Sequence, residues 1–368
     1  MRSPTRWPRV KVLAVSAAVV FTALIIIYLW AVLETSQTRF PDARLEAAVR
    51  DALDGSGRTF SPPELERITE LDAEARGITS LEGIEKLANL AVLNLRGNRV
   101  EDVSPLAALS RLQRVSLRDN DIADLEAVNL IALAGLPELR SLDLRHNRGP
   151  SHPESPDDHN RISDISVLAA FESLEALDIA DNHISDITPL AGLTRLRHLD
   201  LRYNPLDIDD LAALAALTQL EYLNLREAGV RGLSGIQELR NLGYLNLHSN
   251  SAVASIEPMA GLPRLHTLIL RGIPVGPEVT VLETLPALVH LNLRDAEVTD
   301  LAPLARLMDR GALQDDPGSG VFAEIDIREN PVHRRGDPDG YQVLEPYWEN
   351  ISVRSPQVLP PPLSAGAQ

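Results

Sequence analysis

The side chains best suited to chemistry lie together in one polar segment of the chain. His152, Asp157, Asp158 and His159 fall within "RGPSHPESPDDHN" and have the donor types that hold divalent metals. A metal site needs ligands at a defined spacing on a rigid element, whereas this segment is rich in the residues that form turns. A solvated loop is therefore the favoured interpretation. The alternative, a metal-dependent hydrolase, predicts stoichiometric metal in the purified protein.

Other motifs of catalysis and cofactor binding are absent from the sequence. The chain has no cysteine, which excludes disulfides, thiolate metal sites and a cysteine nucleophile. It contains no Gly-rich phosphate loop, G-x-S-x-G or H-E-x-x-H motif, and Asp337 to Gly340 lack the ligand series of an EF-hand loop. The sequence therefore predicts no catalytic residue, no cofactor and no metal site, and the expected function is non-covalent binding.

A repeated leucine pattern must position any binding residues. The pattern L-x-x-L-x-L-x-x-N recurs eleven times with a base period of 22 residues. Such a period is typical of an α/β solenoid in which each repeat supplies one short strand and one helical return segment. The ninth places of the pattern are Arg76, Asn98, Asn120, Asn147, Asn182, Asn204, Ala228, Asn250, Ile273, Ala296 and Asn330.

Segments such as "LANLAVLNLRGNRVEDVSPLAAL" and "LTRLRHLDLRYNPLD" resemble the leucine-rich repeat family, in the 22-residue form of bacterial internalins. The resemblance covers roughly residues 61 to 335. It implies a curved parallel β-sheet on the concave side, short α or 3-10 helices on the convex side, and binding of an unspecified ligand. It also implies that the recurrent asparagines bond backbone groups of adjacent turns. We therefore expect this ladder to be interrupted at Arg76, Ala228, Ile273 and Ala296.

The strand pattern also predicts which side chains face the concave side. Places four and six point into the core, so places three, five and seven point outward. Place five is mostly Asp or Asn, and acidic residues recur at place eight. Two interpretations stay open, a self-neutralising ladder of charges and a groove that attracts anions. Place seven carries Arg96, Arg118, Arg145, Arg202, Arg226, Arg271, Arg294 and Arg328.

Aromatic residues favour one part of the concave side as a binding surface. Tyr203, Tyr222 and Tyr244 occupy concave or strand-end places in three consecutive repeats. Exposed tyrosine and arginine are enriched at binding hot spots, although a chance cluster of surface tyrosines is the alternative. We expect the contact centre to consist of His198, Arg202, Tyr203, Tyr222, Arg226, Tyr244 and His248.

The N-terminal segment predicts attachment to a membrane. Residues 12–33 carry no charge and are long enough to cross a hydrocarbon core of about 30 Å as a helix. Four basic residues precede them, so the positive-inside tendency places residues 1–11 in the cytoplasm and the repeats outside it. The apolar stretch is long for a cleaved signal and no A-x-A follows it, which favours an uncleaved signal anchor.

The remaining segments are expected to close and connect the solenoid. Residues 34–60 should form a linker and helical cap, 61–335 about eleven repeats, 336–354 a C-terminal cap, and 355–368 a disordered tail. Ser104, Thr188, Glu257 and Ala302 each precede a proline and should begin a return helix, whose first turn Ser or Thr can cap. The ninth places Asn120 and Asn147 lie 27 residues apart, and Asn204 and Ala228 lie 24 residues apart; longer return helices are expected in both intervals. Loops are expected at 148–161 and 308–320.

Charge and composition further limit the classes of partner that the chain could bind. A net charge of -17 argues against nucleic acid or an anionic membrane surface as partner. We therefore predict a membrane-anchored, single-pass binding module that recognises a protein, or a glycan, through its concave face. The alternative is a membrane-tethered scaffold that organises partners through its convex face and loops. The bias towards Ala, Arg, Asp and Leu without cysteine suggests a bacterial source, and the predicted anchor then places the chain in the cell envelope.

Overall fold

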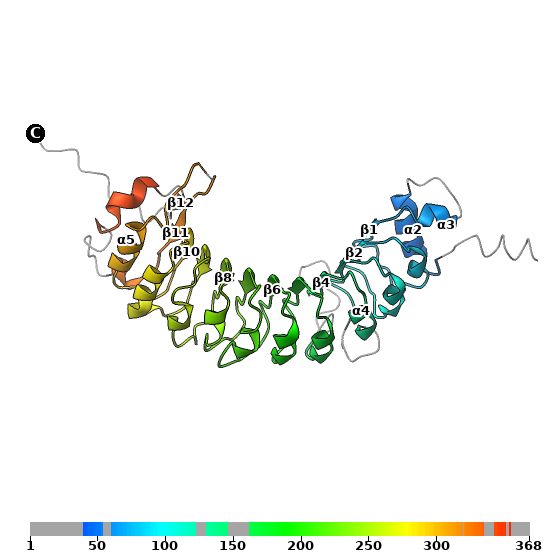
Figure 1. Ribbon diagram of the computed structural model, residues 1–368, viewed down its shortest axis with the longest axis horizontal. Coiled ribbons are helices and arrows are strands. Elements are labelled where there is room, and N and C mark those ends of the chain that lie inside the picture. Colours follow the sequence, from blue (N-terminus) through cyan, green and yellow to red (C-terminus); the bar gives the residue numbers. More distant parts are fainter. Residues whose placement is uncertain are drawn as a thin grey trace, which may run out of the picture.

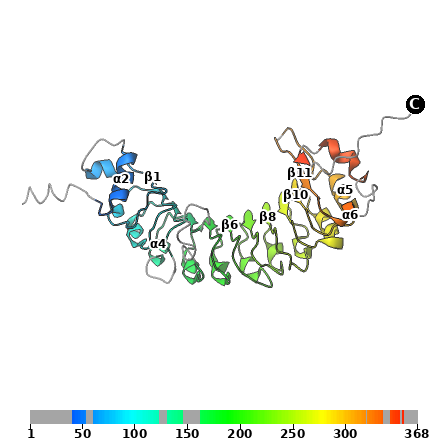
Figure 2. The ribbon, with the colours of Figure 1, turned by 180° about the vertical axis from the view of Figure 1, so that it is seen from behind.

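The structure, a computed structural model, describes residues 40–53, 60–122, 130–145, 162–318, 320–334, 342–350 and 353–354. These residues form a curved solenoid shaped as an open horseshoe (Figure 1), with strands along the inner, concave side and helices along the outer, convex side. Figure 2 shows the same arc from behind, with α2 near one tip and β11 near the other. The predicted solenoid architecture is confirmed.

The described strands form one parallel sheet of twelve strands in sequence order. Neighbouring strands pair place by place, so that Leu199 lies opposite Leu223 and Tyr222 opposite Tyr244. Each repeat therefore adds the same places to continuous columns across the sheet. The strands are β1 (Glu70–Asp72), β2 (Val92–Asn94), β3 (Arg114–Ser116), β4 (Ser141–Asp143), β5 (Ala176–Asp178), β6 (His198–Asp200), β7 (Tyr222–Asn224), β8 (Tyr244–Asn246), β9 (Thr267–Ile269), β10 (His290–Asn292), β11 (Glu324–Asp326) and β12 (Val353–Arg354).

The return segments are short helices, mostly of the 3-10 type. Those expected to begin before a proline do begin at Ser104, Thr188, Glu257 and Ala302. The helices are α2 (Ala43–Ala52), α3 (Pro62–Leu65), η1 (Ile84–Lys86), η2 (Ser104–Ala108), α4 (Ile131–Ala134), η3 (Ser166–Ala170), η4 (Thr188–Gly192), η5 (Ala212–Leu214), η6 (Ile236–Glu238), η7 (Glu257–Met259), η8 (Gly276–Thr284), α5 (Ala302–Met308), α6 (Pro331–Arg334) and η9 (Glu345–Asn350).

Two details of the return helices differ from expectation. Ser104 and Thr188 do not cap their helices. Instead their backbone N–H groups each donate to an aspartate two residues earlier, Asp102 and Asp186, at 2.8 Å. The aspartate side chain is longer than that of serine or threonine, and the charge of its carboxylate strengthens the hydrogen bond to the amide. The 24-residue step also carries only the three residues of η5, because its extra residues extend the preceding loop.

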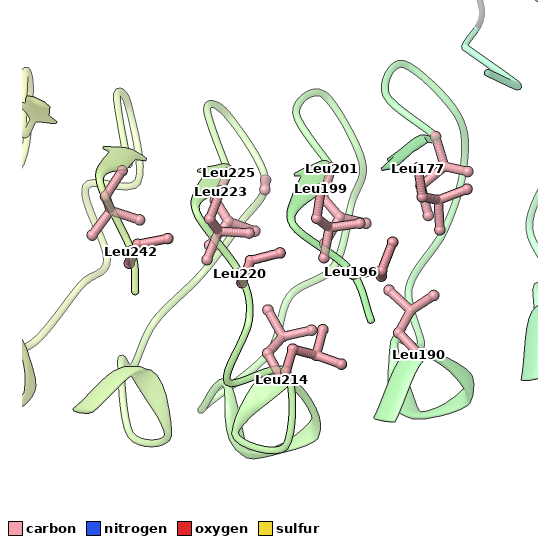
Figure 3. Close-up of a cluster of buried hydrophobic side chains, with 14 of the residues drawn as sticks. Leu177, Leu190, Leu196, Leu199, Leu201, Leu214, Leu220, Leu223, Leu225 and Leu242 are labelled. Atoms are coloured by element: carbon pink, nitrogen blue, oxygen red, sulfur yellow. The ribbon is translucent and has the colours of Figure 1, made fainter. Parts of the chain in front are cut away.

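The core consists mainly of leucines that stack from one repeat to the next (Figure 3), together with isoleucine and valine. In the repeat of β6, Leu196, Leu199 and Leu201 are fully buried and point away from the concave surface. Burying one such side chain contributes about 2 kcal/mol. Because every repeat contributes the same layer, the fold is stabilised along its whole length by contacts between neighbouring repeats only.

The buried asparagines of place nine hold the turns that follow their own strands, as expected. The Nδ2 of Asn204 donates to the carbonyls of Ile179 and Leu201, and its Oδ1 accepts from the amide of Ile184. Ala228 has no side-chain amide and cannot make these hydrogen bonds itself. Its backbone amide is nevertheless held by Asn250 of the next repeat, at 3.2 Å.

The two ends of the described solenoid carry different elements. At the N-terminal end, α2 is capped by Asp42, whose carboxylate accepts from the amides of Arg44 and Leu45, and Phe40 packs edge-on against Phe60. Near the C-terminal end, residues 309–318 and 320–323 follow α5 and contain an antiparallel bridge between Asp316 and Val321. The predicted bounds of the caps stay predictions.

Some predicted segments lie outside the described residues. These are the basic segment 1–11, the apolar segment 12–33, the loop 148–161 and the tail 355–368. Among the helices of the described ranges, none is long and apolar enough to cross a membrane.

Candidate functional site

Three aromatic rings lie face to face across the middle of the concave sheet. His198, Tyr222 and Tyr244 occupy place three of β6, β7 and β8, which the register of the sheet aligns. The ring centroids of His198 and Tyr222 lie 4.0 Å apart and those of Tyr222 and Tyr244 lie 4.3 Å apart, each pair with an interplanar angle of 9°. We call these three residues the aromatic stack.

The spacing of the sheet explains why the rings stack. Neighbouring strands lie about 4.8 Å apart, close to the separation of stacked rings. The stack is further held by amides, because Asn224 and Asn246 donate from Nδ2 to the hydroxyls of Tyr222 and Tyr244 at 3.3 and 3.4 Å. Each inner ring face is therefore covered by the next ring, so that the stack presents ring edges outward.

Burial changes the protonation behaviour of the aromatic stack. It raises the pKa of the Tyr222 hydroxyl, an effect that Tyr244 and Asp200 reinforce. It lowers the pKa of His198, and the charge of Arg202 acts in the same direction, while Asp200 opposes them. At neutral pH Tyr222 and His198 are therefore both uncharged.

A second row of predicted residues lies just beyond the ends of the strands, at places seven and eight. The guanidinium carbon of Arg226 lies 5.3 Å from the centroid of the Tyr203 ring, in a cation–π contact. The Nε of Arg202 lies 3.3 Å from the carboxylate of Asp200. His248 belongs to the same row. Its pKa is lowered by burial first, and then by Arg226 and Arg271.

The backbone at place eight adopts a left-handed conformation that the sequence pattern did not reveal. Tyr203 has φ of 59°, and the corresponding Asp119 and Glu227 have 54° and 52°. This conformation turns the chain away from the strand. It also places acidic side chains near the arginines, as in the pairs Arg118–Asp119 at 3.8 Å and Arg226–Glu227 at 3.1 Å. These pairs support the charge ladder rather than the anion-attracting groove.

The Asp and Asn residues of place five have a backbone role that sequence reasoning missed. The Oδ1 of Asp200 accepts from the amide of Arg202, two residues later, at 3.1 Å. Asn224 makes the same contact with Arg226 at 3.2 Å. A strand followed by a turn leaves this amide without a ladder partner, and a short polar side chain can satisfy it. The recurrence of Asp or Asn at place five in nine of the eleven repeats was the available signal.

Three of these place-five residues are carboxylates on adjacent strands. Asp143, Asp178 and Asp200 are aligned by the register of β4, β5 and β6. Burial raises the pKa of all three, and the pKa of Asp178 reaches about 7 because Asp200 and Asp143 add like charge. Place seven of this strand is Ala180, so the arginine column is interrupted beside Asp178.

All seven predicted contact residues lie on the concave side of adjacent repeats, in two rows. The aromatic stack forms the first row, and Arg202, Tyr203, Arg226 and His248 form the second. Their role in binding stays a prediction. His152, Asp157, Asp158 and His159 lie outside the described residues. Within the described ranges, no group of three or more His, Cys, Asp and Glu residues could hold a metal ion.

Comparison with known proteins gives matches to repeat families and to curated proteins. Residues 88–148 match the family model "Leucine rich repeat", and residues 172–213 match "Leucine Rich repeats (2 copies)". Leucine-rich repeat-containing protein 23 of Xenopus tropicalis is 37% identical over 102 residues, which cover 27% of this chain and 26% of that protein. A protein phosphatase 1 regulatory inhibitor subunit homologue of Arabidopsis thaliana is 28% identical over 40% of this chain and 47% of its own length. The chain thus spans less than half the length of these relatives.

Solved structures match over more of the chain. An internalin (inlF) from Listeria monocytogenes is 26% identical, with a TM-score of 0.67, over 86% of this chain and 88% of that one. A leucine-rich repeat protein of Leptospira interrogans is 19% identical, with a TM-score of 0.53, over 73% of this chain and 74% of that one. The second likeness concerns the fold alone.

Proposed function

Because this chain is a leucine-rich repeat protein with internalin-like repeats, we propose that it is a non-enzymatic binding module that recognises a protein ligand through its concave face. Leucine-rich repeat proteins in general mediate protein binding. The observation that carries the proposal is the aromatic stack, flanked by the second row with Arg202 and Arg226. Tyrosine and arginine combine contact area with hydrogen bonding at modest entropic cost.

The geometry of the stack favours a protein over a glycan. Sugar rings bind tyrosine by lying against an exposed ring face, whereas the inner faces of His198, Tyr222 and Tyr244 are covered by each other. Outward ring edges carry partial positive charge and suit the carbonyl oxygens of a polypeptide. A protein is therefore the proposed ligand class, and a glycan is an outcome that the test below would reveal.

The test compares two double variants of the full chain as baits for proteins that bind it. Tyr222→Ala/Tyr244→Ala removes two members of the stack, while both flanking leucines of each strand stay in place. Glu238→Ala/Arg240→Ala removes two exposed charges from the convex surface around η6. We expect the first variant to lose the partners that the unaltered chain recovers, and the second to keep them.

The opposite pattern would support the alternative scaffold. Loss of partners only in the Glu238/Arg240 variant would assign binding to the convex face, and equal recovery by all three proteins would mean that the contact centre is misplaced. Thermal unfolding of both variants, monitored by circular dichroism, verifies that each is folded.

We also propose that residues 12–33 anchor the chain in a membrane and that the repeats lie outside the cytoplasm. The support is the uncharged length of these residues and the basic residues before them. Protease added to intact cells should then degrade the repeats. Complete protection of the repeats in intact cells, with digestion after lysis, would refute this topology.

A further inference from the structure

The aromatic stack ends abruptly at one strand, and the residue there is small. Place three of β5, opposite His198 in the register, is Ala176, which carries only a methyl group and is partly exposed. The face of His198 that points away from Tyr222 therefore has no ring against it. At the other end, Tyr244 lies opposite Thr267 of β9.

The two ends of the stack differ in the charge beside them. Next to Ala176 on the same strand is Asp178, between Asp143 and Asp200. Next to Thr267 is the uncharged Ile269. The space above Ala176 therefore combines a free aromatic face with carboxylates one side-chain row away, and the space above Thr267 does not.

From this difference we propose that an arginine side chain of the protein partner occupies the space above Ala176. Its guanidinium plane lies against the free face of His198, and its N–H groups point toward the carboxylate of Asp178. The inference rests on the proposed function, since it names the chemistry that the concave face recognises at one end of the aromatic stack.

The shape and charge of a guanidinium fit both neighbours. It is planar, stacks on aromatic rings, and matches a carboxylate with two parallel N–H donors. The chain itself contains such a contact, because the Arg226 guanidinium lies over the Tyr203 ring at 5.3 Å. A lysine ammonium would pair with Asp178 but could not stack over its whole area.

The charges around Asp178 favour a cation over an anion. Asp143 and Asp200 face Asp178 from the neighbouring strands, and Arg145 is the cation that acts on it. Arg202 lies 3.3 Å from Asp200 and is engaged there. Arg118 acts on Asp143 as well, so three carboxylates face three guanidiniums, but Asp178 itself is acted on by two carboxylates and one guanidinium. Burial first, and then the like charge of Asp200 and Asp143, raise the pKa of Asp178 to about 7, and the like charge is relieved when a further cation arrives.

The test uses a defined probe and needs no knowledge of the partner. The blocked tripeptide acetyl-Gly-Arg-Gly-amide is titrated into the full chain, and the ring resonances of His198 are followed by NMR with isotope-labelled histidine. The citrulline tripeptide, which has nearly the same shape but no charge, is the matched probe. We expect a saturable shift with the arginine probe and at least tenfold weaker binding of the citrulline probe.

Two variants at the ends of the stack locate the site. Ala176→Tyr fills the proposed space and should weaken binding of the arginine probe at least tenfold. Thr267→Tyr extends the stack at the other end and should leave binding within twofold. Equal effects of the two variants, or binding of acetyl-Gly-Glu-Gly-amide more tightly than of the arginine probe, would overturn the inference.

The pH dependence identifies the carboxylate. With the pKa near 7, the ionised fraction of Asp178 rises from roughly a tenth at pH 6 to roughly nine tenths at pH 8, so binding should tighten roughly ninefold. Deprotonation of His198 acts in the same direction, because a charged imidazole repels the guanidinium. Asp178→Asn separates the two contributions, because only the pH dependence of binding that is due to His198 should remain in this variant.

Failure of this inference can be told apart from failure of the proposed function. A probe that does not shift His198, together with partners that are lost in the Tyr222/Tyr244 variant, would reject the arginine site alone. If Asp178→Asn does not fold, the comparison of Ala176→Tyr with Thr267→Tyr still decides the question.

Discussion

Replacing Asp178 by asparagine should stabilise the protein, and the gain should grow with pH. The Oδ1 of Asp178 accepts from the amide of Ala180 at 3.0 Å, and the asparagine side chain can keep this bond. The substitution removes a carboxyl group whose pKa is raised to about 7 in the folded protein, first by burial and then by Asp200 and Asp143.

The sign follows from proton linkage. The carboxyl of an unfolded chain has a pKa of about 3.9, so between that value and about 7 the folded state binds more protons and stability falls as pH rises. Full stability is present below the unfolded pKa and is lost through the folded pKa. From pH 5 to pH 7 the loss is at most about 1.4 kcal/mol per pH unit, or about 3 kcal/mol. Partial exposure of the side chain reduces this to about 1 to 2 kcal/mol.

The assay is urea unfolding at pH 5, 6, 7 and 8, followed by far-UV circular dichroism. The midpoint difference between Asp178→Asn and the unaltered chain should widen up to pH 7 and then level off, with similar slopes for both proteins. Asp72→Asn is the matched control, because Asp72 accepts from the Glu74 amide in the same way but is exposed. A difference that stays constant with pH, or equals that of the Asp72 variant, would refute the reasoning.

Three further predictions concern the backbone contacts of the repeats and are tested by chemical unfolding. Asn204→Ala leaves two buried carbonyls and one amide without their partner and should cost about 2 to 4 kcal/mol; a cost below 1 kcal/mol would contradict a structural role. Gly235→Ala should destabilise the protein far more than Gly261→Ala. Both glycines have positive φ, but a Cβ at Gly235 would lie 2.6 Å from the Leu211 carbonyl oxygen, whereas a Cβ at Gly261 would have no atom within 4 Å. Equal losses of stability in the two variants would exclude the clash. Asp186→Ala removes a helix cap and should cost about 1 kcal/mol, and no change would mean that the cap contributes nothing.

The sequence was sufficient for the solenoid because the solenoid follows from local periodicity. Leucines at places one, four and six can all be buried only if each repeat forms a strand and returns over its neighbour, as Leu196, Leu199 and Leu201 do. The same alternation sorted His198, Tyr222 and Tyr244 onto the concave side, because successive side chains of a strand point to opposite faces.

The sequence was insufficient for the details that depend on two repeats at once. Whether the rings of Tyr222 and Tyr244 stand side by side or lie flat depends on strand spacing and on Asn224 and Asn246, and only the folded sheet sets both. The sequence predicted Ser104 and Thr188 as helix caps because hydroxyl side chains commonly cap helices. In the folded chain the backbone N–H group of each residue already donates to a nearby aspartate.

The chemistry of Asp178 belongs to the tertiary structure for the same reason. Asp143, Asp178 and Asp200 all occupy place five, so the repeat pattern already put them in one column, but it did not show how deeply their carboxylates are buried or how strongly they interact. Periodicity determined which residues reach the concave face. Their protonation, their stacking and the space above Ala176 were decided by the neighbours that the folded sheet places beside them, because burial and electrostatic interaction act through distance in space and not along the chain.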